Sequence, residues 1–284
     1  MIADVDLRDA VAAQLAALSA AGQPLNTDSP GCTATRYAAD VERAAFRKRV
    51  VDEYLGLSNP RRDGRSAIIT AGAPGAGKSG LLAEQVPDLA EYRVLDADIV
   101  KEYLIKQALE DGIYDDLLNY PLADGDPLAP RELAPLVHNE SVRLIDQIRR
   151  ICVSLRENIV IEGTLIWPGQ GPTLFAELAE DDYASVCVFG MEVDKKVAHE
   201  QALSRWWTGR KQWTDGDHPL GGRFAPPAVI ETCYTGGDLS RCAQNALHVI
   251  DLAQSGEIPK VRVTIFRRSS TGAIDTFIDR HYQR

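Results

Sequence analysis

The feature that most constrains this chain is a glycine-rich segment, Gly72 to Ser79, with the pattern G-x-x-x-x-G-K-S. Its glycines and small residues let successive backbone N–H groups turn toward one anion. An apolar run at 67–70 precedes the segment, and a helix-favouring run at 80–85 follows it. A strand, such a loop and a helix whose positive dipole end faces the loop form a phosphate-binding site. The sequence therefore predicts that the chain binds a nucleoside triphosphate.

In loops of this kind the lysine reaches the β- and γ-phosphates, and the hydroxyl that follows it ligates Mg²⁺. We therefore expect Lys78 to stabilise the transferred phosphoryl group and Ser79 to hold the metal. The residues expected to contact the nucleotide are Gly72, Gly75, Ala76, Gly77, Lys78, Ser79 and Gly80.

Composition excludes several other classes of protein. Hydrophobic residues make up 45% of the 284 residues, which is enough for a large core. The net charge of −10 argues against an extended nucleic-acid surface, because such a surface is usually basic. The five cysteines form no C-x-x-C pair, which indicates reduced thiols rather than disulfides or a zinc site. The acidic N-terminus and the lack of a long apolar run predict a soluble, cytoplasmic protein without a membrane span.

Short apolar runs alternate with helical patterns, which predicts a doubly wound α/β fold with a mostly parallel sheet and helices on both faces. The runs expected to form strands are 66–71, 92–96, 158–162 and 184–190, with an edge pair at 247–252 and 260–267. Helices are expected at 99–110, 131–156, 194–210 and 226–246. The segment 111–130 is rich in Pro, Asp and Gly and is predicted to be a long functional loop.

Two further helical patterns, at 4–21 and 34–55, precede the phosphate-binding segment. We therefore predict a helical N-terminal extension at residues 1–58 and a P-loop domain at residues 59–284.

Acidic residues follow the predicted strand 92–96, in the run Asp96-Ala97-Asp98. Ligands of open α/β sheets bind outside the carboxyl ends of the strands. Side chains two residues apart share a face of a strand, so both carboxylates are expected to point the same way. A small-molecule kinase needs a carboxylate there to accept the proton of the acceptor hydroxyl. We assign that role to Asp98, with Asp96 as a substrate-side helper; the alternative is that Asp98 caps the helix that follows.

The next strand ends in Glu162, followed by Gly163 and Thr164. A carboxylate at the end of so apolar a strand is costly unless it has a partner, which favours a functional role. We expect Glu162 to bind the acceptor or to hold Mg²⁺ through water, and Thr164 to donate a hydrogen bond to the substrate.

Phosphoryl transfer also needs cations over the charge that develops on the transferred group. Arg205, on the predicted helix 194–210, and Arg223, after the pair Gly221-Gly222, are the candidates. Taken singly, either arginine is more often a surface ion-pair partner.

Three other groups of residues are interpreted as structural. The tryptophans near Arg205 are expected to pack in the core, because aromatic side chains bury large areas. His138 has no neighbours at metal-ligand spacing, and the runs Lys195-Lys196 and Arg267-Arg268 are interpreted as solvated faces.

Several features of this sequence together resemble the zeta toxin family. They are the phosphate-binding segment, the Asp-Ala-Asp strand end, the run Val160-Ile161-Glu162-Gly163-Thr164, the helix with Arg205 and the Gly222-Arg223 pair. Members of that family are P-loop kinases of toxin–antitoxin systems, and the resemblance covers roughly residues 36–266. It implies ATP- and Mg²⁺-dependent phosphorylation of a UDP-activated amino sugar, typically UDP-N-acetylglucosamine at the 3′-hydroxyl of the sugar.

Carried onto this sequence, the resemblance implies that Lys78 and Ser79 serve phosphate and metal, Asp98 is the general base, and Arg205 and Arg223 clamp the phosphates. It further implies substrate-binding roles for Asp146, Glu162 and Thr164. The chain departs from the family in having Leu165-Ile166-Trp167 where a small and a basic residue often follow. The resemblance also implies a small helical antitoxin; the helix at 4–21 is either a fused element of that kind or a packing extension, and we favour the latter.

Other functions fit a phosphate-binding loop as well. A P-loop NTPase switch uses hydrolysis to drive conformational change, but it usually has an aspartate where this strand ends in Glu162. A kinase of another small molecule, such as an antibiotic, or of a polynucleotide end is a second alternative, and the acidic composition weakens the polynucleotide version. A third alternative is an inactive nucleotide-binding protein.

Overall fold

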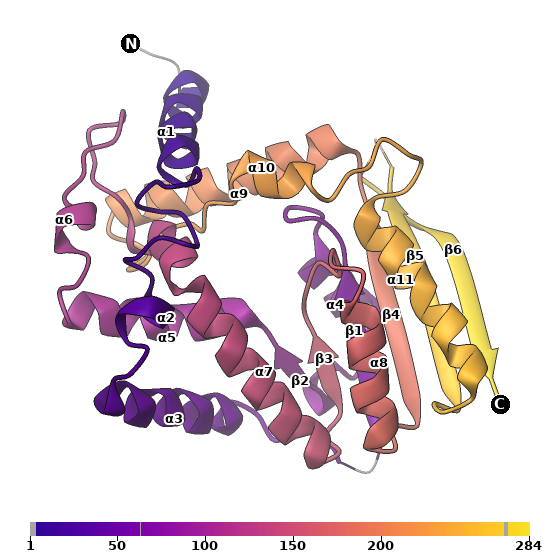
Figure 1. Cartoon of the computed structure of the whole chain (residues 1–284). Coiled ribbons are helices and arrows are strands. Elements are labelled where there is room, and N and C mark those ends of the chain that lie inside the picture. The colour runs from indigo at the N-terminus through magenta and orange to yellow at the C-terminus, as the bar shows by residue number, and fades with distance from the viewer. Residues whose placement is uncertain (1–3, 63, 270–271) are drawn as a thin grey trace. The chain divides into compact units, whose positions relative to one another are not determined.

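The computed structural model describes residues 4–62, 64–269 and 272–284. Figure 1 shows the chain with its elements labelled. The helices are α1 Asp4–Leu18, α2 Thr33–Arg36, α3 Val41–Gly56, α4 Lys78–Gln85, η1 Leu89–Glu91, α5 Ala97–Glu110, α6 Asp115–Leu118, η2 Pro130–Val137, α7 His138–Ser154, α8 Gln170–Glu180, α9 Lys195–Thr214, α10 Pro227–Glu231, α11 Arg241–Leu252 and η3 Ala253–Ser255. The strands are β1 Ser66–Ala71, β2 Arg93–Leu95, β3 Ile159–Ile161, β4 Ser185–Glu192, β5 Lys260–Arg268 and β6 Ile274–Gln283.

The chain divides into two compact units that alternate along the sequence. The helical unit consists of residues 1–54, 97–146 and 201–227, and the sheet unit of residues 55–96, 147–200 and 228–284. The predicted domain boundary at residue 58 is not a boundary between these two units, because the helical unit includes residues on both sides of it. The division into an N-terminal extension and a P-loop domain stays a prediction.

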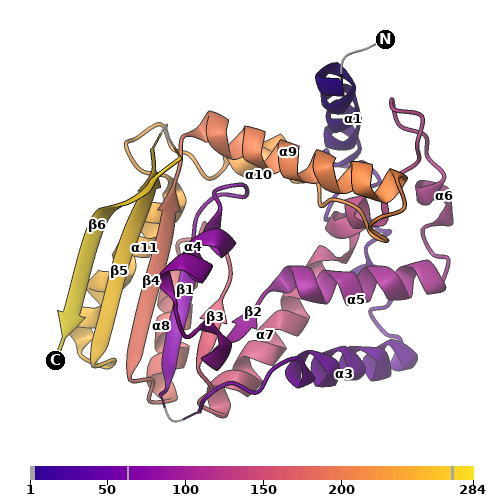
Figure 2. The ribbon, with the colours of Figure 1, turned by 180° about the vertical axis from the view of Figure 1, so that it is seen from behind.

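Over the described residues, the sheet unit is built on six strands in the order β2-β3-β1-β4-β5-β6. The first five strands are parallel, and β6 pairs antiparallel with β5. Leu82 of α4 and Val86, which follows the helix, pack against Ile68 and Val160 on one face, and helices α8 and α11 cover the other (Figures 1 and 2). This is the predicted α/β fold with a mostly parallel sheet, and that prediction is confirmed.

The helical unit has its own core, in which α1 takes part. Val11 and Leu15 of α1 are fully buried in one cluster with Trp206 and Trp207 of α9. The indole N–H of Trp207 also donates to Asp4 at 3.1 Å. Helix α1 is therefore an integral part of the packing of this unit, as we favoured.

Several predicted elements differ from those observed. The pattern at 34–55 is split into α2 and α3, and the pattern at 226–246 is split into α10 and α11 by the segment 232–240. The predicted strand at 247–252 is wrong, because these residues belong to α11. Ser240 caps this helix, accepting a hydrogen bond from the backbone N–H of Ala243 at 3.2 Å. The edge strand β6 was not predicted, and the loop predicted at 111–130 contains the short helix α6.

Within the described part of the chain, we find no helix with both the length and the apolar character needed to cross a bilayer.

Candidate functional site

The phosphate loop lies between the end of β1 and the start of α4, in the sheet unit. Its first residue, Gly72, has a φ of +149°, and a Cβ at this position would lie 2.8 Å from the carbonyl oxygen of Met191. The backbone N–H of Gly72 donates to the carbonyl of Thr164 at 3.1 Å. Glycine is thus required at residue 72 both for backbone conformation and for space, and the loop is hydrogen-bonded to the segment that follows β3.

The loop side chains predicted to be functional lie at the first turn of α4. Lys78 begins the helix, and its ammonium donates to the carbonyls of Gly72 and Ala73 at 2.9 and 3.1 Å. Ser79 follows with an exposed side chain. The backbone of Gly75 and Gly77 is left-handed, with φ of +83° and +89°, which turns the chain so that α4 begins at the loop. A Cβ on Gly80 would meet no atom within 4 Å.

The predicted strand-end residues of the sheet unit also lie at this edge. Asp96 directly follows β2, and Glu162 directly follows β3, its backbone N–H donating to Leu95 at 3.0 Å. Both side chains are half-buried, as is Thr164. Because β1, β2 and β3 are parallel neighbours, their carboxyl ends share one edge, and the loop and these polar residues lie along it.

Asp98 belongs to the helical unit, where two cations hold it. One carboxylate oxygen accepts from the ammonium of Lys101 at 2.8 Å, and the other contacts the guanidinium of Arg223. Burial acts to raise the pKa of Asp98, but the charges and hydrogen bonds of Lys101 and Arg223 outweigh it and hold the pKa well below its usual range. The carboxylate is therefore ionised at neutral pH.

The expectation that Asp96 and Asp98 share a strand face is wrong. The strand ends at Leu95, and Asp98 is the second residue of α5. Its side chain is turned to Lys101 on the next helical turn and to Arg223, so the geometry around it is that of a small ion cluster.

His138 stands close to this cluster. Burial lowers the pKa of His138 to about 4, and the positive charges of Lys101 and Arg223 act in the same direction. The imidazole is therefore neutral at neutral pH, and it adds no third positive charge beside Asp98.

A close packing of backbones fixes the segment that carries Arg223. A Cβ on Gly222 would lie 2.1 Å from the carbonyl oxygen of Trp206, and one on Gly209 would lie 2.6 Å from the Cα of Gly222. The two glycines thus let the segment lie directly on the backbone of α9. Arg205, also on α9, is exposed. Asp146 lies half-buried on α7.

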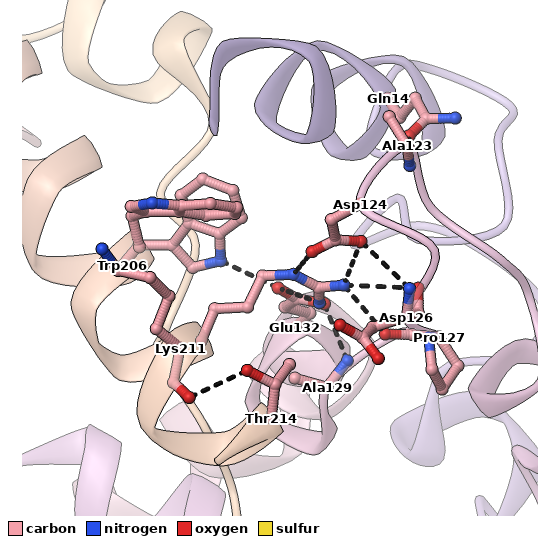
Figure 3. A network of polar contacts seen from close by, with 12 residues as sticks. Gln14, Ala123, Asp124, Asp126, Pro127, Ala129, Glu132, Trp206, Lys211 and Thr214 are labelled. Carbon is pink, nitrogen blue, oxygen red and sulfur yellow. Dashed lines mark hydrogen bonds and ion pairs between the residues drawn. The ribbon is translucent and has the colours of Figure 1, made fainter. Parts of the chain in front are cut away.

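Helix α9 is held in the helical unit by a buried ion network, shown in Figure 3. The guanidinium of Arg210, fully buried, donates to both oxygens of Asp124 at 2.7 and 2.9 Å and to Glu132 at 2.9 Å. The indole N–H of Trp206 donates to Glu132 at 2.8 Å. The far end of the predicted loop 111–130 is thereby fixed to the helix that bears Arg205.

The sequence-based interpretation of Arg267 and Arg268 as a solvated charge run is wrong for Arg268. The Nε atom of Arg268 is buried, and the Nη2 atom lies 2.7 Å from the position that a Cβ on Gly77 would occupy. Both arginines line a cavity of about 530 Å³ in the sheet unit, together with Glu192, Asp194, Tyr234 and Asp238. No sequence pattern near Arg268 indicated this placement.

Lys101 and Arg210 were likewise missed from the sequence. Lys101 lies one helical turn after Asp98, and that spacing is a signal that was available. Arg210 has no such local signal, because its partners Asp124 and Glu132 are far from it in the chain.

The comparisons agree with this geometry. Residues 51–274 match the zeta toxin family, and no curated protein matches the chain. A chain of the AvrRxo1-ORF1:AvrRxo1-ORF2 structure with sulphate ions is 16% identical at a TM-score of 0.60, covering 90% of this chain and 73% of that chain. A chain of the PezAT chromosomal toxin–antitoxin system of the human pathogen Streptococcus pneumoniae is 14% identical at a TM-score of 0.54, covering 85% of this chain and 81% of that chain.

At these identities the two structures show a shared fold, whereas the family match spans most of the sequence. The phosphate loop and the residues after β3, which lie at one edge of the sheet, fall within the matched range. The chain therefore belongs to the zeta toxin family, whose members are kinases that use ATP.

Proposed function

We propose that this kinase transfers the γ-phosphoryl group of ATP to the 3′-hydroxyl of the sugar in UDP-N-acetylglucosamine, with Asp98 as the general base. The observation that carries the proposal is the ion cluster around Asp98, in which an ionised carboxylate lies between Lys101 and Arg223. An ionised carboxylate accepts a hydrogen bond from an acceptor hydroxyl and orients its oxygen for attack. The cations beside it are of the kind that stabilise a transferred phosphoryl group.

The other residues are proposed to act on the nucleotide. Lys78 exchanges its loop carbonyls for phosphate oxygens, and Arg205 and Arg223 neutralise the charge on the transferred group. Ser79 suits Mg²⁺, because its hydroxyl is exposed at the start of α4 and hydroxyl oxygen is a hard ligand. The metal, when bound, neutralises charge on the phosphates. The cavity of about 530 Å³ has the size of a small-ligand site and is proposed to take the nucleoside.

Acceptor binding is proposed for Asp96, Glu162, Thr164 and Asp146. The first three follow strands that end at the edge of the sheet bearing the phosphate loop. Their carboxylate and hydroxyl oxygens are suited to the hydroxyl groups of a sugar. After Thr164 the chain has Leu165 with a φ of +53° and Trp167 with 62% of its surface exposed, where the family often has a small and a basic residue.

We further propose an antitoxin as a partner. The solved structures with this fold include a protein of a toxin–antitoxin system and a complex of two gene products. Because α1 is part of the core of the helical unit, the proposed antitoxin is a separate chain rather than α1 itself.

The experiment is ATP turnover by the purified protein against a panel of UDP-sugars, with the products identified by mass. We expect one phosphate to appear on UDP-N-acetylglucosamine and none on UDP alone. Product on an antibiotic or a polynucleotide end instead would replace the proposed acceptor. ATP hydrolysis at one rate with and without every acceptor would replace the kinase reaction with an NTPase switch.

A further inference from the structure

The strongest unexplained feature outside the roles assigned above is the guanidinium of Arg268. This residue ends β5, and β5 pairs in parallel with β4, so Arg268 lies at the same edge of the sheet unit as the phosphate loop. Its Nη2 atom lies 2.7 Å, and its Cζ atom 3.7 Å, from where a Cβ on Gly77 would be. The side chain therefore lies against the last loop residue before α4.

Within the described parts of the chain, the Nε atom of Arg268 is buried and has no hydrogen-bond partner. A buried N–H on a charged group that lacks an acceptor costs free energy, and native proteins rarely leave one unsatisfied. The neighbouring Arg267 makes a useful contrast. Its guanidinium stacks 3.4 Å from the ring centre of Phe277 and donates to the carbonyl of Asp238 at 3.4 Å. Of these two consecutive arginines, Arg268 is the one with a buried Nε that lacks an acceptor among the described residues.

The two ligand groups that suit a guanidinium here are a phosphate and a planar base. The position beside Gly77 favours the phosphate, because Gly77 immediately precedes the first N–H groups of α4. Those groups and the helix dipole attract an anion to the same place. A phosphate oxygen would satisfy the Arg268 donors with charge-assisted hydrogen bonds.

We infer that Arg268 is a nucleotide-binding residue that contacts the phosphate chain from the β5 side of the loop. This inference rests on the proposed use of a nucleoside triphosphate and adds a further arginine to Arg205 and Arg223. It also gives Gly77 a second function, because any side chain at this position would displace the guanidinium.

Calorimetric titration of the whole chain with ATP, inorganic tripolyphosphate and adenosine tests the inference, since it needs no acceptor and no turnover. In Arg268→Met we expect the affinities for ATP and for tripolyphosphate to fall together by about 10- to 100-fold, the range of one or two charge-assisted hydrogen bonds. We expect the affinity for adenosine to stay unchanged. Arg268→Gln, which keeps a polar side chain, serves if the Met variant does not fold.

Arg262→Met is the matched control. Arg262 lies on the same strand, is exposed, and pairs with Asp279 at 2.9 Å, so its loss removes the same charge without touching the loop. We expect its ATP affinity to equal that of the unmodified chain.

Two results would overturn the inference. One is an unchanged ATP affinity in folded Arg268→Met. The other is an equal loss of affinity for ATP and adenosine with the affinity for tripolyphosphate unchanged, which would assign Arg268 to the base. If the proposed acceptor, UDP-N-acetylglucosamine, were wrong, the result would be different from either of these. The unmodified chain would then bind ATP with the Arg268 dependence intact, yet phosphorylate no UDP-sugar.

Discussion

The guanidinium of Arg223 lies directly against one carboxylate oxygen of Asp98, while Lys101 occupies the other oxygen at 2.8 Å. A carboxylate held by two cations accepts a hydrogen bond well but binds a whole proton weakly. For Asp98 to take the proton of an acceptor hydroxyl, Arg223 has to move its charge toward the transferred phosphate. The proposed base and the proposed phosphate clamp are therefore coupled through one ion pair.

Replacing Asp98 by Asn is expected to lower kcat by about 10²- to 10⁴-fold, the range for loss of a general base. ATP affinity is expected to change little, because the phosphate-loop residues are untouched. Turnover by product mass and nucleotide binding by calorimetry are the measurements. Asp116→Asn, an exposed aspartate of α6 in the same unit, is the control. Near-full turnover in folded Asp98→Asn would remove Asp98 from the mechanism.

Replacing Arg223 by Met is expected to lower kcat by about 10²- to 10³-fold. It also removes a positive charge that lowers the pKa of Asp98, so that pKa rises. The acid side of the kcat–pH profile should therefore move to higher pH relative to the unmodified chain. Profiles extended below pH 4, as far as the protein stays folded, test this. An acid limb that stays in place while kcat falls would show that Arg223 acts without influencing Asp98.

His138 is expected to make stability pH-dependent. Its folded-state pKa is about 4, below the value of about 6.5 for an unfolded chain, so the folded state favours the neutral ring. The stabilisation is complete above about pH 6.5 and is lost as the pH falls toward 4. We expect a loss of the order of 2 kcal/mol between pH 7 and 4.5. Urea unfolding of the unmodified chain and of His138→Gln at both pH values measures this contribution. The variant should lack the part of the stability loss that comes from His138.

Arg210→Met is expected to destabilise the helical unit by about 3 to 5 kcal/mol, because it leaves the buried carboxylates of Asp124 and Glu132 without their cation. Thermal unfolding is the measurement. Lys211→Met, one residue along α9 and half-exposed, should melt close to the unmodified chain. Equal melting of the two variants would show that the Figure 3 network contributes no net stability.

Local patterns gave the correct prediction where the structure depends on neighbours in sequence. The phosphate loop is read from eight consecutive residues, and β1 was predicted with its observed bounds. Strand β6 escaped prediction because its side chains are mostly exposed on both faces, which leaves no alternation of apolar residues. The run at 247–252 is apolar enough for a strand. The features that indicate a helix are the Ser240 cap and the burial of Cys242, Ala246 and Val249 at helical spacing.

The candidate site was predicted in its parts rather than in its contacts. Asp98 and Arg223 were both named from the sequence, yet 125 residues separate them, and no local rule pairs them. Arg268 was interpreted as solvated, and no local rule pairs it with Gly77; the two residues come together only because β5 ends at the edge where α4 begins. Contacts of this kind are set by the order of strands in the sheet.

The carbonyls that hold Lys78 have one more consequence. The ammonium donates to the carbonyls of Gly72 and Ala73 of its own loop, and the N–H of Gly72 in turn donates to the carbonyl of Thr164, three positions after the end of β3. An arriving nucleotide therefore meets a loop that is already folded, and its phosphate oxygens replace these two carbonyls as acceptors for Lys78. The entropic cost of ordering this loop is met when the chain folds, so nucleotide binding does not have to include that cost.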